Sequence, residues 1–541
     1  MPVLSRRNLA RITFAVCAFS FSVSAALGQA ITTYHVDNNR TGWNSHETIL
    51  TPANVGSTFF VQLHGVKLND QVDAQPLFVP AVNITAGSFQ GTHDVVYVAT
   101  EGNTVYAIDA ESGTVLLNPN FGAPVARPLG CANNGPNVGI NSTPVIDITT
   151  NTLYVMIYTQ DSTGPAYRIH ALDLGSLTDK VTPQLVVASH ALLDGSTFNF
   201  NATYQRQRPA LLLSNGAVYA AFGSFCDFFA NLSRGWLLGW STNTLTPLAS
   251  NQVMDTLATS PDSYFLTAIW MSGYGPSTDD AGNVLFVTGN SDFNGSTYDG
   301  VNNIQESVVK VSSDLSSVLD LFTPSNQASL DETDQDFGSG GVMVLPDQPG
   351  AMPHLAVAAG KAGSMFLMNE DALGGYSTTT NNVLGTYSIG ACWCGESYFV
   401  DPSDGIGRVV ASGGTAVSIY KVQTTGATPS LSKISLSGSL GSTVQNGGFF
   451  TSISSNGTAS PIIWAISRPQ GTTGNPIYLY AFDPENVTKH TMKTLVKIRA
   501  GAWTNIGGNA NLVPLVTNGE VFVASNGQLR IFGIKSTAAK K

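Results

Sequence analysis

The chain repeats one local pattern along most of its length. A short apolar run ends at a Gly or Asn, and a second apolar run then leads into an acidic turn. In the clearest copy, residues 95–100 and 104–109 flank the turn Glu101-Gly102-Asn103. Short strands that recur at a period of about 60 residues indicate radial repetition. Eight such groups follow residue 70. The sequence therefore predicts an all-β fold, an eight-bladed β-propeller of four-stranded antiparallel blades.

The last group has too few strands for a complete blade. Residues 57–69 contain an isolated strand-like run that has no partner nearby, and we expect it to supply the missing outer strand. This pairing would close the propeller over residues 57–534 and remove exposed sheet edges. The polar residues 31–56 are expected to wrap the outside as an N-terminal extension, and residues 535–541 to form a disordered tail. The groups follow one another without linkers, which favours one domain over an array of β-sandwiches.

The composition narrows the possible partners. Only 11% of the 541 residues are charged and 54 are glycines, which is typical of turn-rich β proteins outside the cytoplasm. The net charge of -11 and the lack of a basic stripe exclude nucleic acid and anionic membranes as partners.

The N-terminus has the features of an export signal. Arg6 and Arg7 precede the apolar residues 12–27, and small residues around Ala26 offer cleavage sites. We therefore expect residues 1–30 to be a signal peptide and the protein to be periplasmic or extracellular. An ordinary secretory signal and a twin-arginine signal both fit the two arginines. No later run reaches the roughly 18 apolar residues of a membrane span.

Four cysteines remain after the predicted signal: Cys131, Cys226, Cys392 and Cys394. An oxidising compartment favours disulfides, but the pairing cannot be deduced from spacing. Cys392-Trp393-Cys394 fits a redox or metal pair, or two structural thiols with distant partners. No cluster of histidines accompanies the pair as a zinc site would need, so we favour the structural interpretation.

The fourth group contains the most specific local sequence. Trp270 lies within Ala-Ile-Trp-Met-Ser-Gly, and Asn290 ends a Thr-Gly-Asn turn 20 positions later. Here the chain resembles the quinoprotein alcohol dehydrogenases, eight-bladed propellers that hold pyrroloquinoline quinone (PQQ) and Ca²⁺ near the ring axis. The resemblance implies that Trp270 stacks on the quinone and that Asn290 ligates calcium. An aromatic floor and an amide oxygen suit a flat, metal-chelated cofactor.

Three further residues take roles from the same resemblance. Asp336, in the acidic segment 331–337, matches the catalytic Asp of the family and is also a metal ligand. Lys361 matches the basic residue that contacts the quinone oxygens. Asp227 lies where the family has a calcium-binding Glu. The resemblance implies that Ca²⁺ polarises a quinone carbonyl, Asp336 removes the substrate hydroxyl proton and Lys361 stabilises the oxygen charge that develops.

Each of these residues also has a structural interpretation. Trp270 would pack between blades, Asn290 would satisfy a turn, and Lys361 would neutralise the solvated acidic loop around Asp336. The order of the residues along the chain favours the functional interpretation. It predicts an exported oxidoreductase that oxidises an alcohol or sugar. Because no Cys-x-x-Cys-His haem sequence occurs, the electron acceptor would be a separate molecule.

Several departures from the family favour an alternative function. Only Cys131 stands where the dehydrogenases have two adjacent cysteines, and the chain has only seven tryptophans. Residues 37–44 resemble the start of a shorter group of exported bacterial PQQ-repeat proteins. The alternative is a non-catalytic propeller that binds a protein or glycan partner in the cell envelope.

Overall fold

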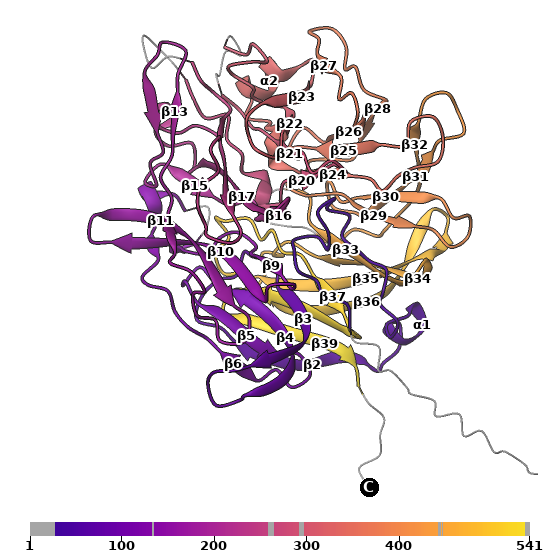
Figure 1. Cartoon of the computed structure of the whole chain (residues 1–541). Helices are drawn as coiled ribbons and strands as arrows, with labels where there is room; N and C mark the ends of the chain where they lie inside the picture. Colours follow the sequence, from indigo (N-terminus) through magenta and orange to yellow (C-terminus); the bar gives the residue numbers. More distant parts are fainter. Residues whose placement is uncertain are drawn as a thin grey trace, which may run out of the picture.

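The computed structural model describes residues 28–132, 135–257, 264–291, 297–441, 445 and 447–535. The chain folds as a β-propeller of four-stranded antiparallel blades (Figure 1). Most of the predicted signal peptide, residues 1–27, and most of the predicted tail, residues 536–541, lie outside the described residues. Within the described ranges, no helix has the length and apolar character needed to cross a membrane.

The blades follow one another along the chain. The first blades consist of β3 (Leu77–Ile84), β4 (Gly91–Ala99), β5 (Val105–Asp109) and β6 (Val115–Leu117); β9 (Val145–Asp147), β10 (Thr152–Asp161), β11 (Gly164–Asp173) and β12 (Gln184–Leu185); and β16 (Leu212–Ser214), β17 (Ala217–Ser224), β18 (Trp236–Ser241) and β19 (Gln252–Val253). The next blades consist of β20 (Ser277–Thr278), β21 (Val284–Val287), β22 (Val308–Val311) and β23 (Val318–Thr323); β24 (Val342–Val344), β25 (Leu355–Ala359), β26 (Ser364–Asn369) and β28 (Gly385–Ser388); and β29 (Ser397–Val400), β30 (Gly407–Ala411), β31 (Ser418–Gln423) and β32 (Ser430–Leu436). The last blades consist of β33 (Thr451–Asn456), β34 (Ala459–Ile466), β35 (Pro476–Thr488) and β36 (Thr491–Ala502); and β37 (Leu515–Thr517), β38 (Glu520–Ser525), β39 (Gln528–Ile534) and β2 (Phe60–Lys67).

Short elements decorate these blades. They are β1 (Trp43–Asn44) on β33, β15 (Gln205–Gln207) on β17, β27 (Gly375–Tyr376) on β23, the pairs β7 (Val125–Ala126) with β8 (Asn137–Val138) and β13 (Ser189–Ala191) with β14 (Thr197–Asn199), and the helices α1 (Pro52–Val55) and α2 (Gln327–Glu332).

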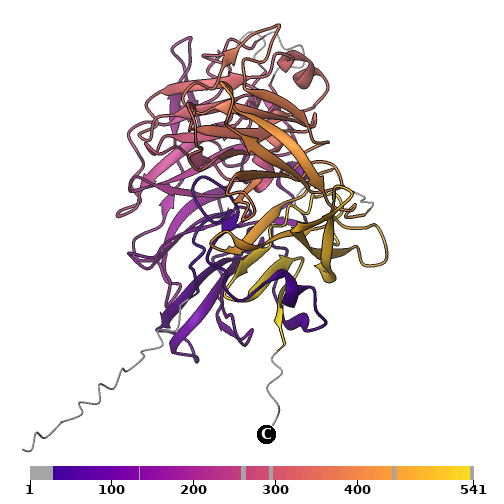
Figure 2. The same cartoon turned by 90° about the vertical axis from the view of Figure 1, so that its right-hand side faces the viewer.

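The two ends of the described chain meet in one sheet. Strand β2 pairs antiparallel with β39 over most of its length, and the two lie side by side at the bottom of Figure 1. Helix α1 contacts β39 and lies beside the C-terminal strands in Figure 2. The outer edge of the last sheet is therefore covered by an N-terminal strand, and no long unpaired edge is left there.

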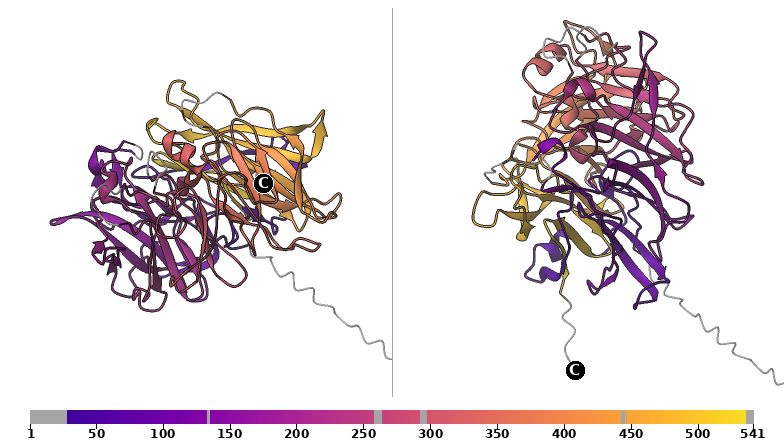
Figure 3. Two further views of the ribbon diagram at one scale, coloured as in Figure 1. Left: turned by 90° about the horizontal axis from the view of Figure 1, so that it is seen from above. Right: turned by 90° about the vertical axis from the view of Figure 1, so that its left-hand side faces the viewer.

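The core lies between the sheets. Most buried side chains of each apolar cluster come from two consecutive blades, whose sheets stack face to face around the molecule (Figure 3). One cluster joins the last blade to the first, because Ile531 and Leu529 of β39 pack with Phe78 and Val96 of the first blade. The ring is thus closed both by hydrogen bonds and by packing.

The repeated acidic turn has a clear local cause. After β5, Asp109 Oδ1 accepts hydrogen bonds from the N–H of Ser112 at 2.8 Å and from its hydroxyl. After β11, Asp173 Oδ1 accepts the same pair of hydrogen bonds from Ser176. An Asp that accepts hydrogen bonds from the residues ahead of it turns the chain, which explains why this residue ends the third strand in each of these two blades.

The sequence led us to expect that the N-terminal extension wraps the outside of the propeller. This expectation was wrong. Residues 31–47, here called the N-terminal strap, contact the first strand of one blade after another. Their partners are Phe78, Ile146, Leu213, Thr278, Val344, Tyr398, Ile453 and Val516. First strands of neighbouring blades contact one another, so the strap lies across the centre of the ring. Its polar residues Tyr34, His35 and Arg40 are at most 2% exposed. The His35 ring bonds the main-chain carbonyl of Thr451, and Arg40 donates to that of Pro276, so these two side chains anchor the strap to the blades.

Candidate functional site

A cavity of about 470 Å³ opens near the centre of the ring. Its lining comes from several blades and includes Arg206, Arg208, Ser224, Cys226, Asp227, Phe228, Trp270, Asp334, Asp336, Lys361, Trp393, Gly507 and Asn509. Four of the residues singled out in the sequence therefore share one cavity: Asp227, Trp270, Asp336 and Lys361. Asn290 is not among the lining residues.

Short turns place Trp270 and Asp336 at the cavity. Trp270 immediately precedes the 3-10 turn Met271–Gly273, and Asp336 immediately precedes the 3-10 turn Phe337–Ser339. Gly289 lies between them: a Cβ atom there would be 3.1 Å from Trp270 Nε1 and 3.6 Å from Asp336 Cγ. A residue without a side chain lets the indole and the carboxylate approach each other.

Asn290 does not line the cavity as Trp270 and Asp336 do. Its carbonyl accepts a hydrogen bond of 2.8 Å from the N–H of Thr267, which ties it to the segment that carries Trp270. The residue is 5% exposed, and its side-chain amide makes no hydrogen bond to any described residue. The structure thus keeps Asn290 next to the Trp270 segment but off the surface of the cavity.

Lys361 joins two carboxylates of the acidic segment. Its Nζ lies 2.7 Å from Asp336 Oδ2 and 3.0 Å from Asp334 Oδ1. Burial raises the pKa of Asp336 to about 6, although the charge of Lys361 opposes this rise. Burial lowers the pKa of Lys361, but attraction to Asp336 and Asp334 outweighs it and leaves that pKa above its usual value. The ion pair foreseen by the structural interpretation forms, and it does so inside the cavity.

Two carboxylates of the cavity retain unused acceptor capacity. Asp336 Oδ1 is buried and has no hydrogen-bond partner in the described part of the chain. Asp227 Oδ1 accepts a hydrogen bond of 2.5 Å from the Ser224 hydroxyl, and burial raises the pKa of Asp227. The negative charge of Asp227 also helps to raise the pKa of Asp336.

Sequence reasoning missed two arginines of the cavity. Arg206 lies on β15 and Arg208 directly follows it, and they are 4% and 6% exposed. The guanidinium carbon of Arg208 lies 5.8 Å from the centre of the Trp270 ring. The available signal was the cluster Arg-Gln-Arg itself, which is unusual in a chain with so few charges.

The structure shows how the four cysteines pair, which their spacing in the sequence could not show. Cys131 is joined to Cys226, and Cys226 lines the cavity. A disulfide is therefore present at the cavity although adjacent cysteines are missing from the sequence. The second disulfide joins Cys392 to Cys394. The expectation that these two thiols find distant partners was wrong, because the loop folds back tightly enough to bring them together.

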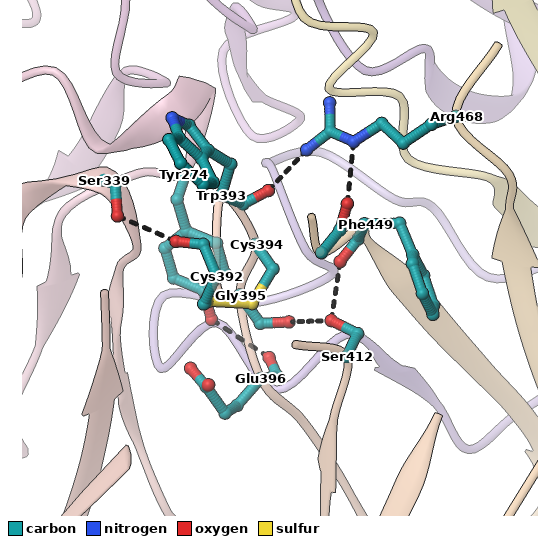
Figure 4. Close-up of a disulfide and its surroundings, with 11 residues drawn as sticks. Tyr274, Ser339, Cys392, Trp393, Cys394, Gly395, Glu396, Ser412, Phe449 and Arg468 are labelled. Atoms are coloured by element: carbon teal, nitrogen blue, oxygen red, sulfur yellow. Dashed lines mark hydrogen bonds between the residues drawn. A yellow bond between two sulfur atoms is a disulfide. The ribbon is translucent and has the colours of Figure 1, made fainter. Parts of the chain in front are cut away.

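Trp393 lies between the two cysteines of the second disulfide (Figure 4), and its side chain lines the cavity. Lys361 Nζ lies 5.5 Å from the ring centre of Trp270 and 5.6 Å from that of Trp393, so the ammonium group is close to two indoles. Such cation–π contacts stabilise the ammonium charge beside the two aromatic rings.

Four neighbouring side chains fix the backbone of this loop. Ser339 donates to the carbonyl of Cys392, Arg468 to that of Trp393, Ser412 to that of Gly395, and Tyr274 to that of Glu396 (Figure 4). A loop with four carbonyls held in this way loses little entropy when a ligand contacts its side chain.

Comparisons with known proteins identify the fold. No protein-family model matches the sequence, and no curated protein matches it. A solved quinohemoprotein alcohol dehydrogenase from Comamonas testosteroni superposes with a TM-score of 0.60 at 13% identity, over 95% of this chain and 81% of that one. A quinohemoprotein alcohol dehydrogenase from Pseudomonas putida HK5 gives 0.58 at 13% identity, over 95% and 81%. A europium-containing methanol dehydrogenase gives 0.60 at 12% identity, over 93% and 98%. The chain shares the propeller fold of these enzymes.

Proposed function

We propose that this protein is an exported oxidoreductase that binds a planar quinone of the PQQ type with Ca²⁺ and oxidises an alcohol or sugar. The observation that carries the proposal is the meeting of Trp270, Asp336, Lys361 and Asp227 in one cavity. These residues come from more than one blade, and a shared cavity is what a common ligand requires. The solved alcohol and methanol dehydrogenases with the same fold support the choice of chemistry.

The lining fits a flat, anionic quinone. Trp270 is partly exposed to the cavity and offers an indole face for stacking. Lys361 and Arg208 both lie within 6 Å of that ring and provide positive charge for quinone oxygens or carboxylates. The bound quinone would supply the redox chemistry by accepting a hydride equivalent from the substrate.

The cavity offers the type of donor atom that a calcium ion binds. Asp336 Oδ1 lacks a partner, Asp227 is a second carboxylate, and oxygen ligands are what Ca²⁺ prefers. In the described parts of the chain, these acids do not form a group of three ligand atoms close together. The oxygens of the bound quinone would therefore complete the coordination.

The protein's own residues would handle the proton. Asp336, as a carboxylate, would accept the substrate hydroxyl proton on Oδ1, which has no hydrogen-bond partner in the described part of the chain. Lys361 holds the other oxygen, Oδ2, and so fixes the orientation of the carboxylate. Its charge lies beside the same ring of Trp270 and would stabilise negative charge on a stacked ligand.

The test is a titration of the purified protein, without residues 1–30 and supplied with Ca²⁺, with PQQ. Binding is followed by absorbance and thermal shift, and activity by reduction of an artificial dye with alcohols and sugars. We expect saturable binding that Asp227→Asn weakens, because Asp227 is the second carboxylate of the cavity, and dye reduction that Asp336→Asn abolishes. Asp280→Asn is the matched control, because Asp280 is exposed and lies off the cavity.

Absence of binding at tens of micromolar PQQ, where a weak site still gives a thermal shift, would contradict the proposal. The protein would then be a non-catalytic propeller, and its protein or glycan partner would be sought.

A further inference from the structure

Arg208 differs from the other buried arginines near the cavity. It is 6% exposed and lines the cavity, yet it makes no hydrogen bond and no ion pair with any described residue. Its one described contact is with the ring of Trp270. A guanidinium group carries five N–H donors, and burying them without acceptors is costly.

Three neighbouring arginines show the usual solution. Arg40 donates to four main-chain carbonyls at 2.8 to 3.4 Å, among them those of Pro276 and Tyr34. Arg468 donates to two carbonyls and to the side-chain oxygen of Asn511. Arg206 donates twice to the Asn141 side-chain oxygen, at 3.1 and 3.2 Å. The fold therefore satisfies buried guanidinium groups in this region where it uses them structurally.

The nearest acidic groups do not satisfy Arg208. Asp73 and Glu101 attract it electrostatically, but neither forms an ion pair with it. These two carboxyl groups are hydrogen-bonded to each other, and Glu101 also accepts a hydrogen bond from the N–H of Gly139. Because they already have partners, the donors of Arg208 are left for a ligand in the cavity.

We propose that Arg208 binds a carboxylate group of the ligand that occupies this cavity. This inference rests on the cavity being the ligand site described under the proposed function. The planar fork of a guanidinium group matches the two oxygens of a carboxylate and binds them in parallel. The carboxylate would lie beside the Trp270 ring, so the ligand combines a flat or apolar part on the indole with an acidic group at its edge.

Two sources can supply this carboxylate. It belongs either to an acidic quinone such as PQQ or to the substrate, which would then be a hydroxy acid or sugar acid rather than a neutral alcohol. The experiment below separates the two sources by removing the carboxylate from one ligand at a time.

The first arm compares PQQ with its trimethyl ester on the Ca²⁺-supplied protein, using quenching of tryptophan fluorescence. If the cofactor supplies the carboxylate, Arg208→Gln lowers the affinity for PQQ at least tenfold and leaves the affinity for the ester unchanged. Arg208→Lys keeps the charge but not the fork, and it gives an intermediate loss. The second arm compares gluconate with glucose on the PQQ-loaded protein by calorimetry. If the substrate supplies the carboxylate, Arg208→Gln weakens only gluconate.

Arg499→Gln is the matched control, since it removes the same charge from an exposed position. If Arg208→Gln changes neither PQQ nor gluconate binding while PQQ still binds, the inference is wrong and the proposed function stands. If PQQ does not bind the unmodified protein, the proposed function fails. A third arm, a thermal-shift assay with phthalate, then tests the inference without PQQ. If Arg208 binds carboxylates, phthalate raises the melting temperature of the unmodified protein but not that of Arg208→Gln. If phthalate raises both melting temperatures or neither, the inference is wrong.

Discussion

The N-terminal strap and the cavity both bring arginine into the centre of the propeller, but they treat it differently. Arg40 of the strap is 0% exposed and its guanidinium group is surrounded by acceptors from the blades. Arg208 of the cavity is nearly as buried and has none. Tyr34 lies within electrostatic range of both, so the two environments are close together. The fold itself supplies hydrogen-bond acceptors for Arg40, whereas the donors of Arg208 have acceptors only when a ligand binds.

This difference separates stability from function within one small region. A buried charge with all its hydrogen bonds made is expensive to remove, because its acceptors lose their partners. A buried charge without partners destabilises the empty protein and is retained for another reason. Natural proteins commonly accept this cost at binding sites. The predictions below test whether the two arginines fall into these two classes.

The largest effect is expected for Arg40→Met. The substitution leaves the carbonyls of Pro276, Tyr34 and Leu211 without a donor in the centre of the ring. We expect the free energy of unfolding to fall by about 3–5 kcal/mol, measured by urea denaturation. A loss below 1 kcal/mol would show that the strap is not needed to complete the centre.

A similar magnitude is expected for the pH dependence of Glu396, which lies beside the second disulfide. Both of its carboxylate oxygens are buried without partners, and burial raises its pKa to about 7. The folded state therefore holds this proton more tightly than the unfolded state, whose pKa is about 4.5. Its contribution to stability is complete below pH 4.5 and is lost as the pH rises to 7, by about 3 kcal/mol.

Glu396→Gln removes this titration. The difference in unfolding free energy between the variant and the unmodified protein should shift in favour of the variant between pH 4.5 and 7.5. Urea denaturation at several pH values measures it. A difference that stays constant with pH would mean that Glu396 has a partner in solution.

Arg208→Met should have the opposite sign to Arg40→Met. Without ligand, replacing the unpaired guanidinium by an apolar side chain should raise the free energy of unfolding by about 1–3 kcal/mol. Thermal and urea denaturation of the ligand-free protein measure the change. Loss of stability comparable to that of Arg40→Met would remove the distinction between the two regions.

The smallest effect is expected at Trp393, the second indole of the cavity. Trp393→Ala should weaken PQQ binding by about three- to tenfold through lost stacking, with little change in melting temperature because the side chain is partly exposed. Trp393→Phe keeps an aromatic face and should retain most of the affinity. Quenching of the tryptophan fluorescence by PQQ in both variants provides the measurement. Equal affinity in Trp393→Ala and in the unmodified protein would show that Trp393 does not contact the ligand.

The fold could be predicted from sequence because its signals are local. Alternation of apolar residues and the acidic turns, such as that at Asp109, fix the strands and hairpins without reference to the rest of the chain. The positions of Trp270, Asp336 and Lys361 in one cavity also agree with their order along the chain, although their roles remain predictions. The strap was misplaced because polar residues such as Arg40 suggest the surface, and only their partners in other blades explain their burial.

The sequence by itself determined the strands, the turns and the radial repetition, since each depends on residues close together in the chain. Which residues share the cavity, and which polar groups find partners there, depends on the closed ring of blades. Arg208 and Asp227 lie in loops next to strands of one blade, whereas Trp393 lies in the loop between β28 and β29, and they line one cavity only because the sheets stack around a common centre. Which donors find acceptors there is a property of that packing. For this reason the satisfied Arg40 and the unsatisfied Arg208 look alike in the sequence and differ in the structure.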